Sequence, residues 1–170
     1  RLTGNYEKAE PLCLEAIAIK KQTSGTENPH YCGSLINLAN VYKDMGHNEK
    51  AEQLFLEAKE IFEARLNNRN HPYYANCLHN LATLYKDTGN YEKAEALFLE
   101  AMAIREKVLG KEHPNYAYSL NHLATLYWHL GNYEKAEPFF LEFSKVDRTL
   151  VANAFHHLSE RELSIYLFSF

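Results

Sequence analysis

One block of residues recurs at a nearly fixed spacing along this chain of 170 residues. Each copy has a glycine followed, three positions later, by the tetrapeptide Glu-Lys-Ala-Glu. These glycines, at positions 4, 46, 89 and 131, lie 42, 43 and 42 residues apart. The last three copies also carry Leu-Ala-Asn-Val-Tyr or Leu-Ala-Thr-Leu-Tyr shortly before the glycine. A period of this length is typical of a solenoid, in which each repeat packs on its neighbours and the array presents a surface to a partner.

The most regular copy, residues 72–113, predicts two antiparallel helices. Pro72 suits the first turn of a helix, and Gly89 suits the left-handed residue that follows the last turn. Asn90 is a natural N-cap for the second helix. Neither helix can bury its apolar stripe alone, so stacking on the next repeat must bury it. The stripes, spaced as on one helical face, are Leu78, Leu81, Ala82 and Tyr85 in the first helix and Ala94, Phe98, Ala101, Met102 and Ile104 in the second.

Applied to every copy, this pattern predicts an all-α, right-handed solenoid of helix pairs, with a long last helix and a short terminal helix. The first copy is truncated, because it supplies only a second helix. The repeat array covers residues 1–144, and residues 145–170 form a helical junction toward a downstream domain. The expected helices span residues 5–23, 30–45, 48–67, 73–88, 90–109, 115–130 and 133–157, with the terminal one from about residue 160.

The end of the fourth copy departs from the pattern. It lacks counterparts of Gly110 and Pro114, so one helix of about 25 residues is expected there. Phe143 replaces an alanine of the earlier copies and requires a different packing partner. Ser159 opens a capping box for the terminal helix, whose apolar stripe would be exposed without a downstream domain. The side chains expected to contact that domain are Phe143, Leu163, Tyr166, Leu167 and Phe170.

The order of residues in each copy resembles the tetratricopeptide repeat. The long period and the Leu-Gly-x-x-His-Pro joint, residues 109–114, are similar to the kinesin-light-chain type of this repeat. The resemblance extends over residues 1–144. It implies that the chain binds other proteins, and that the first helix of each repeat lines a concave groove.

The segment from Leu158 to Leu167, Leu-Ser-Glu-Arg-x-Leu-x-x-Tyr-Leu, resembles the junction between tetratricopeptide repeats and the CHAT domain, a caspase-like peptidase module of bacterial proteins. This resemblance implies that the repeats regulate a downstream cysteine peptidase. Some members of that family act with RNA-guided CRISPR effectors. The catalytic His and Cys of the family lie in the downstream domain, so no catalytic residue is assigned to this chain.

The groove positions follow from aligning the copies on their glycines. They are not needed for the stripe between helices, and stacking places them in rows that suit an extended peptide or a helix of the partner. Gly33 and Ile36 occupy the first two of these groove positions. The further candidate partner-binding residues are Asn40, Lys43, Asp44, Asn76, His79, Thr83, Lys86, Asp87, Tyr118, Asn121, Thr125, Trp128 and His129.

Two of these assignments have structural alternatives. Lys43 and Lys86, with the aspartates that follow them, could form solvated ion pairs between repeats that contribute little. Trp128, the sole tryptophan, is either an interface anchor or a side chain packed under the last helix or the downstream domain.

Composition argues against several classes of function. The net charge of −4 and the absence of a dense basic patch argue against direct nucleic-acid binding, and no apolar run is long enough to span a membrane. Cys13, Cys32 and Cys77 lack metal or disulfide spacing, which favours reduced thiols in a cytoplasmic protein. No metal or cofactor site and no nucleophile with a base at suitable spacing is present, so this segment is expected not to be an enzyme.

Two functions remain open at this point. One is a repeat region that binds a protein partner and regulates a downstream CHAT peptidase. The other is a stand-alone adaptor that binds an extended peptide and has no associated enzyme.

Overall fold

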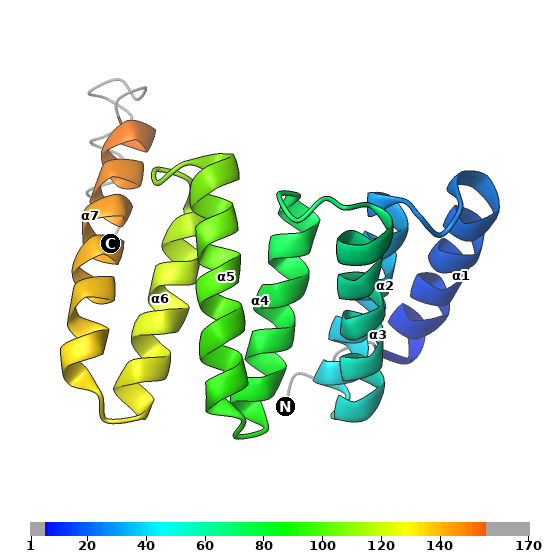
Figure 1. The fold of residues 1–170 in the computed structure, drawn as a ribbon, viewed down its shortest axis with the longest axis horizontal. Coiled ribbons are helices and arrows are strands. Elements are labelled where there is room, and N and C mark those ends of the chain that lie inside the picture. Colours follow the sequence, from blue (N-terminus) through cyan, green and yellow to red (C-terminus); the bar gives the residue numbers. More distant parts are fainter. Residues whose placement is uncertain (1–5, 156–170) are drawn as a thin grey trace, which may run out of the picture. The chain divides into compact units, whose positions relative to one another are not determined.

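The computed structural model describes residues 6–155, which form helices and contain no strand (Figure 1). Each helix predicted from the repeat is present, and the ends that fall within residues 6–155 lie within about two residues of the predicted ones. The helix predicted from about residue 160 lies outside the described residues. The elements are α1 (Tyr6–Ser24), α2 (Pro29–Asp44), α3 (Asn48–Glu60), the π-helical stretch η1 (Ile61–Arg65), α4 (Pro72–Asp87), α5 (Tyr91–Leu109), α6 (Pro114–His129) and α7 (Tyr133–Phe155).

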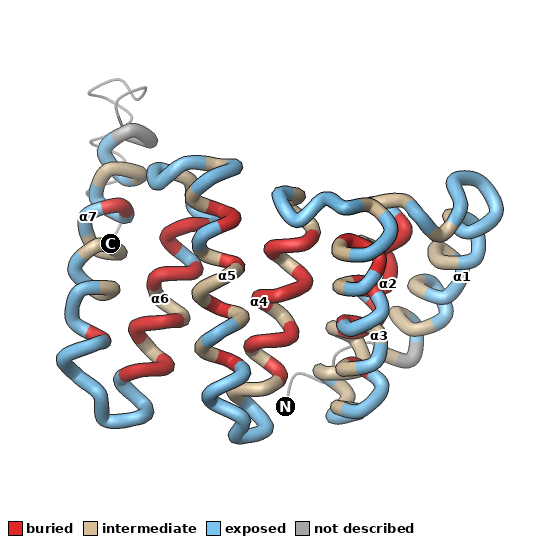
Figure 2. The backbone as a smooth tube through the Cα atoms, in the orientation of Figure 1, coloured by how far each residue is buried: buried red, intermediate tan, exposed pale blue. Residues whose placement is uncertain are grey.

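The chain forms two compact units, residues 1–108 and 109–170, and each is described by itself. In the first unit, α2 packs on α1 and α3, and α4 packs on α2 and α3. Figure 2 shows that buried positions are frequent on α2 and α4, whereas the described side chains of α1 are half-buried or exposed. In the second unit, α6 packs on α7. Three alanines of the predicted apolar stripes, Ala82, Ala94 and Ala101, are completely buried.

The turn at Gly89 shows why a glycine recurs once per repeat. Its φ of +83° lies in the left-handed region. Its N–H donates to the carbonyl of Lys86, and the N–H of Asn90 donates to that of Tyr85. These two bonds form the Schellman motif that satisfies the last carbonyls of a helix. At the opposite end of α4, Nδ1 of His71 accepts a hydrogen bond from the N–H of Tyr73 at 3.1 Å, which caps the first turn.

The two recurring sequence blocks contact each other between neighbouring repeats. The hydroxyl of Tyr42 donates to Glu10 at 2.8 Å, and the hydroxyl of Tyr85 donates to Glu52 at 2.7 Å. In both pairs, the tyrosine ends the Leu-Ala block and the glutamate ends the Glu-Lys-Ala-Glu block of the preceding repeat. The lysine of each repeat's own block covers the same ring, with Lys50 over Tyr42 at 5.1 Å, Lys93 over Tyr85 at 5.0 Å and Lys135 over Tyr127 at 5.2 Å. The repeated residues therefore hold the repeats together.

Gly46 and Gly89 lie one residue further apart than the other recurring glycines, and the joint between the second and third repeats is longer to match. Residues 66–71 separate η1 from α4, whereas residues 110–113 separate α5 from α6. Before this joint, residues Ile61–Arg65 form a π-helical turn, in which the N–H of Leu66 donates to the carbonyl of Ile61 at 2.9 Å.

The long last helix was predicted because helix-breaking residues are missing, and the structure confirms it. α7 extends without a break past Val151 to Phe155, the last described residue. Pro138 lies inside α7, and Pro11 lies inside α1. Phe143 is half-buried on α7, whereas Ala58, at the corresponding position of the second repeat, is completely buried.

Candidate partner-binding groove

A hollow of about 270 Å³ lies between α1, α2 and α4 in the first unit. We call it the α2–α4 hollow. It is lined by the first helices of two consecutive repeats, together with the second helix of the truncated one. The lining residues are Lys20 from α1, His30, Gly33, Ser34, Ile36 and Asn37 from α2, and Tyr73 and Asn76 from α4.

The missing side chain of Gly33 keeps this hollow open. A Cβ atom at this position would lie 3.4 Å from Cε2 of Tyr73, so the tyrosine ring lies directly against the backbone of α2. The ring of His30 contacts that of Tyr73 edge-on, with the centroids 6.0 Å apart. The positions that correspond to Gly33 in the next repeats are occupied by Asn76 and Tyr118. A glycine inside a helix costs stability, and it permits close approach of another backbone.

The polar groups of the hollow differ in their hydrogen bonding. The hydroxyl of Ser34 donates to the carbonyl of His30 at 3.2 Å, and Oδ1 of Asn76 accepts a bond from Arg105 at 2.9 Å. Within the described part of the chain, the side chains of Lys20 and Asn37 have no such partner. One cation and one amide are therefore available to a ligand.

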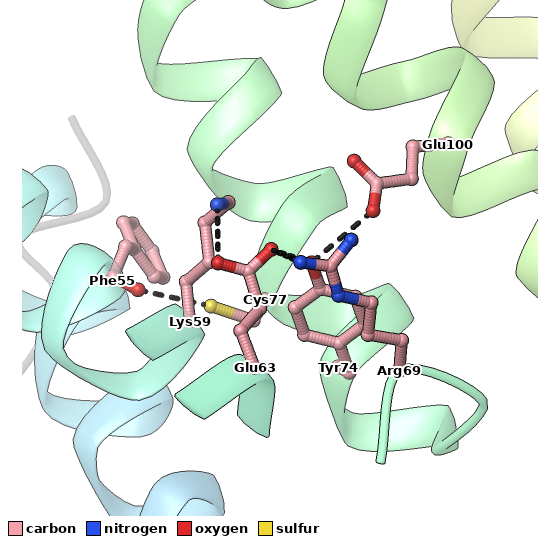
Figure 3. Close-up of polar contacts among 7 residues, drawn as sticks. All are labelled: Phe55, Lys59, Glu63, Arg69, Tyr74, Cys77 and Glu100. Atoms are coloured by element: carbon pink, nitrogen blue, oxygen red, sulfur yellow. Dashed lines mark hydrogen bonds and ion pairs between the residues drawn. The ribbon is translucent and has the colours of Figure 1, made fainter. Parts of the chain in front are cut away.

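A cluster of polar contacts centred on Glu63 connects η1 with α4 (Figure 3). The hydroxyl of Tyr74 donates to Glu63 at 2.6 Å, and the ammonium of Lys59 donates to it at 2.9 Å. The guanidinium of Arg69 lies 3.6 Å from the same carboxylate. Burial raises the pKa of Glu63, but the hydrogen bonds from Tyr74 and Lys59 and the positive charges of Lys59 and Arg69 outweigh it, so the pKa is lowered. Burial and the bond to Glu63 raise the pKa of Tyr74.

All three cysteines are free. Burial raises the pKa of the Cys32 thiol to about 11, and burial also raises that of Cys77, whose thiol donates to the carbonyl of Phe55 at 3.2 Å. Such thiols are poor nucleophiles. No group of three His, Cys, Asp or Glu side chains in residues 6–155 could hold a metal ion. No helix in that range is long and apolar enough to cross a membrane.

Of the candidate binding residues predicted from the sequence, Asn76 lines the α2–α4 hollow, as do Gly33 and Ile36. Asn40 and Lys43 are half-buried further along α2, and Asp44 is exposed. On α4, Thr83 and Lys86 are half-buried, and Asp87 is exposed.

His79 is not a surface residue, which corrects its assignment to the groove. It is only 2% exposed, and its ring packs edge-on against Phe98 with the centroids 5.0 Å apart. Its Nδ1 lies 3.3 Å from the guanidinium of Arg105. The position faces the second helix of the same repeat, and Ile36 at the same repeat position is also buried. The side chain of His79 therefore belongs to the contact between helices.

Several polar candidates already have local contacts. Lys43 pairs with Asp44 at 3.8 Å, and Lys86 pairs with Asp87 at 3.5 Å, so each ion pair joins sequence neighbours and not successive repeats. The hydroxyl of Thr83 donates to the carbonyl of His79 at 3.0 Å. Such contacts are weak, and a ligand can replace them at little cost.

The candidates on α6 belong to the second unit. Tyr118, Trp128 and His129 are exposed, whereas Asn121 and Thr125 are half-buried. The hydroxyl of Thr125 donates to the carbonyl of Asn121 at 2.7 Å. Trp128 contacts α7 through Tyr133 and Phe140 and is still 56% exposed, so it combines features of both alternatives considered for it.

Sequence reasoning missed most of the lining of the hollow. Alignment on the glycines follows one row of each first helix, whereas the missed residues lie at other positions of that helix or on α1. The isolated Gly33 within a helical pattern was the signal that could have located them. The missed residues are Lys20, His30, Ser34, Asn37 and Tyr73.

A family model of the tetratricopeptide repeat matches the chain over residues 1–64, 34–107 and 75–149. The chain therefore belongs to the tetratricopeptide repeat family, whose members form helical scaffolds that bind other proteins. The resemblance to this family predicted from the sequence is confirmed. No curated protein matches the chain.

Solved structures agree with this family. The chain is similar to BtubC (BKLC) from P. vanneervenii, with 23% identity and a TM-score of 0.78, over 94% of this chain and 59% of that one. It is similar to a Podosopora anserina protein described as a kinesin light chain with nearly identical TPR-like repeats, with 27% identity and a TM-score of 0.66, over 92% of this chain and 71% of that one. It is also similar to MamA, with 13% identity and a TM-score of 0.58, over 87% and 81% of the two chains. The kinesin-light-chain-like form of the repeat is thereby supported.

Proposed function

We propose that the α2–α4 hollow binds an extended segment of a protein partner. The observation that carries this proposal is Gly33, which leaves space beside α2 where the next repeats have asparagine and tyrosine. The partner's chain lies beside Gly33 and the ring of Tyr73, and the side chains of Lys20 and Asn37 bind its carbonyl or carboxylate groups. The polar residues further along the first helices, including Lys43 and Lys86, extend this surface.

The experiment compares a filled hollow with an altered surface elsewhere. A photoreactive side chain at Asn37 identifies the partner in its native cells, and the purified partner is then titrated against defined variants. Gly33→Gln, which fills the hollow, should weaken binding at least tenfold, since several contacts are lost together. Gln53→Lys on the exposed face of α3 is the control and should bind normally. Equal affinity of the two variants would refute the proposal.

The relation to a CHAT peptidase is a separate proposal. It is supported by the segment from Leu158 to Leu167, which lies outside the described residues. In this arrangement the downstream domain packs on Phe143 and on the apolar positions after Leu158, in a cytoplasmic protein, and a partner such as a CRISPR effector controls the peptidase. Extending the gene sequence beyond Phe170 tests it: an α/β region with a His and a later Cys is expected. Another full repeat there, or a stop codon, would favour the stand-alone adaptor.

A further inference from the structure

Tyr73 connects the first turn of α4 with the wall of the α2–α4 hollow. Its ring lines the hollow and lies against the backbone of α2, where a Cβ atom at Gly33 would be 3.4 Å from Cε2 of the ring. Its backbone N–H donates to Nδ1 of His71 at 3.1 Å, and this bond is the side-chain cap of α4. One residue therefore takes part in both the cap of the helix and the wall of the hollow.

The ring of His71 is held between two aromatic rings. It stacks on the completely buried Phe62, with the centroids 5.4 Å apart and an angle of 28° between the ring planes. It also contacts the ring of Tyr73, at a centroid distance of 5.3 Å. The imidazole of His71 is half-buried as a result, and it cannot turn away from the N–H of Tyr73 without losing these contacts.

The cap requires a neutral imidazole. A ring nitrogen that accepts a hydrogen bond carries no proton, so the proton of neutral His71 is on Nε2. The imidazolium form carries a proton on both nitrogens and would direct Nδ1–H at the N–H of Tyr73. The positive end of the helix dipole at the start of α4 also repels this charge. Uptake of a proton by His71 therefore breaks the cap.

The charged groups around His71 oppose its protonation in the capped state. Burial lowers the pKa of His71, and the positive charge of His30 on α2 lowers it further. On η1, the carboxylate of Glu63 is already bound within its own cluster, and Arg65 is a further cation; Arg69 lies in the joint. Because this pKa lies below the unconstrained value of about 6.5, the capped form binds fewer protons than an open form, and acid favours the open form.

The caps of the other helices differ from this one. Asn28 caps α2 by accepting a bond from the N–H of His30 at 2.8 Å, and its amide does not titrate. His113 caps α6 through the N–H of Asn115 at 3.1 Å, in the second unit. Among these three caps, the one at α4 joins a titratable side chain to a residue that lines the α2–α4 hollow.

We propose that protonation of His71 releases Tyr73 and weakens the binding of a partner segment in the α2–α4 hollow. This inference rests on the proposed function of that hollow and adds a regulation to it. The chain binds the segment near neutral pH and releases it in mildly acidic solution.

The first measurement needs no partner. Proton NMR of the whole chain follows the ring protons of His71 and the nuclear Overhauser effect between the Tyr73 ring and the Hα atoms of Gly33. The range is about pH 7.5 to about pH 5, above the values at which carboxylates ordinarily titrate. The Overhauser effect should disappear in step with the titration of His71.

Two variants separate His71 from other titrating groups. His71→Asn retains a cap of the kind that Asn28 provides, so its Overhauser effect between residues 73 and 33 should stay constant over the same range. His113→Asn makes the same change at the cap of α6, and it should behave like wild type. His30 is present in all three proteins, so its own charge affects them equally.

The second measurement uses the purified partner identified by crosslinking at Asn37. Between about pH 7.5 and about pH 5, the affinity of wild type should fall about fivefold more than that of His71→Asn, which is the factor that corresponds to the loss of one helix cap. His113→Asn should show the same fall as wild type.

An Overhauser effect that persists while His71 titrates would overturn the proposal, as would an imidazole that stays neutral down to about pH 5. Wild type alone decides these two outcomes, so they do not depend on the folding of a variant. An equal fall in affinity for wild type and His71→Asn would overturn it as well. If Gly33→Gln bound the partner normally, the proposed function of the hollow would fail, whereas the NMR titration would still show whether His71 releases Tyr73.

Discussion

Gly33 is required for the proposed binding in the α2–α4 hollow, but a glycine at this position lowers the stability of the helix. Its φ is not in the left-handed region, so alanine fits the helical backbone, and its Cβ would meet Tyr73 at an ordinary contact distance of 3.4 Å. Gly33→Ala should therefore stabilise the chain by about 0.5–1 kcal/mol, because glycine loses more backbone entropy on folding. Urea unfolding measures the change. A destabilised variant would mean that Tyr73 cannot yield, and Asn37→Ala, an exposed position of the same helix, is the control.

Glu63 gives the chain a pH dependence whose direction follows from its contacts. Its pKa is lower in the folded state than in the unfolded state, so its contribution to stability is present above the unfolded value of about 4.3 and is lost as the pH falls through the folded value. Wild type should thus be more stable than Glu63→Gln at pH 7, and the two should converge at acidic pH. Unfolding free energies measured from pH 7 to pH 3 check this. A difference that stays constant with pH would show that the charge of Glu63 contributes nothing.

At the scale of helices, each tyrosine–glutamate bond connects neighbouring repeats. Tyr85→Phe removes the hydrogen bond to Glu52 and keeps the ring under Lys93, so it should cost about 1–2 kcal/mol. Tyr91→Phe, at an exposed ring, is the control and should cost less than about 0.5 kcal/mol. Thermal unfolding of the two variants measures both losses of stability. Equal losses would show that the hydrogen bond between Tyr85 and Glu52 does not stabilise the contact between repeats.

Overpacking tests the close helix approach at Ala82. This residue is completely buried, and leucine would force the helices apart. Ala82→Leu should cost about 1–3 kcal/mol. A cost below 0.5 kcal/mol would indicate that space remains beside α4, contrary to its complete burial.

The helices were predictable from sequence because recurring glycines and His-Pro joints mark their ends, and because apolar stripes mark their faces. The π-helical turn at Ile61–Arg65 was not, since the composition of this segment does not distinguish it from an ordinary helical turn. His79 was assigned to the groove because alignment on glycines gives the row of a residue and not the direction of its side chain. The packing of Phe98 against it decides that direction, and this contact depends on how α5 packs against α4.

At the scale of the whole molecule, stability should vary along the chain, because each repeat is held by its neighbours. In the first unit, α4 contributes the completely buried Tyr74, Leu78 and Ala82, whereas α1 leaves Leu12 and Ile19 more than half exposed. Native-state hydrogen exchange should therefore show faster exchange in α1 than in α4, because few buried apolar contacts favour local opening.

Partner binding should change hydrogen exchange in these helices unequally. A segment bound in the α2–α4 hollow contacts Lys20 of α1 as well as α2 and α4, so it should slow exchange in α1 more than in α4, which is already protected. Lys43→Glu combined with Lys86→Glu should weaken that effect while the melting temperature stays within a degree or two, because both lysines form only weak ion pairs with their sequence neighbours. If the double variant lowered the melting temperature substantially and still bound the partner normally, these lysines would be structural residues and the binding surface would be confined to the hollow around Gly33.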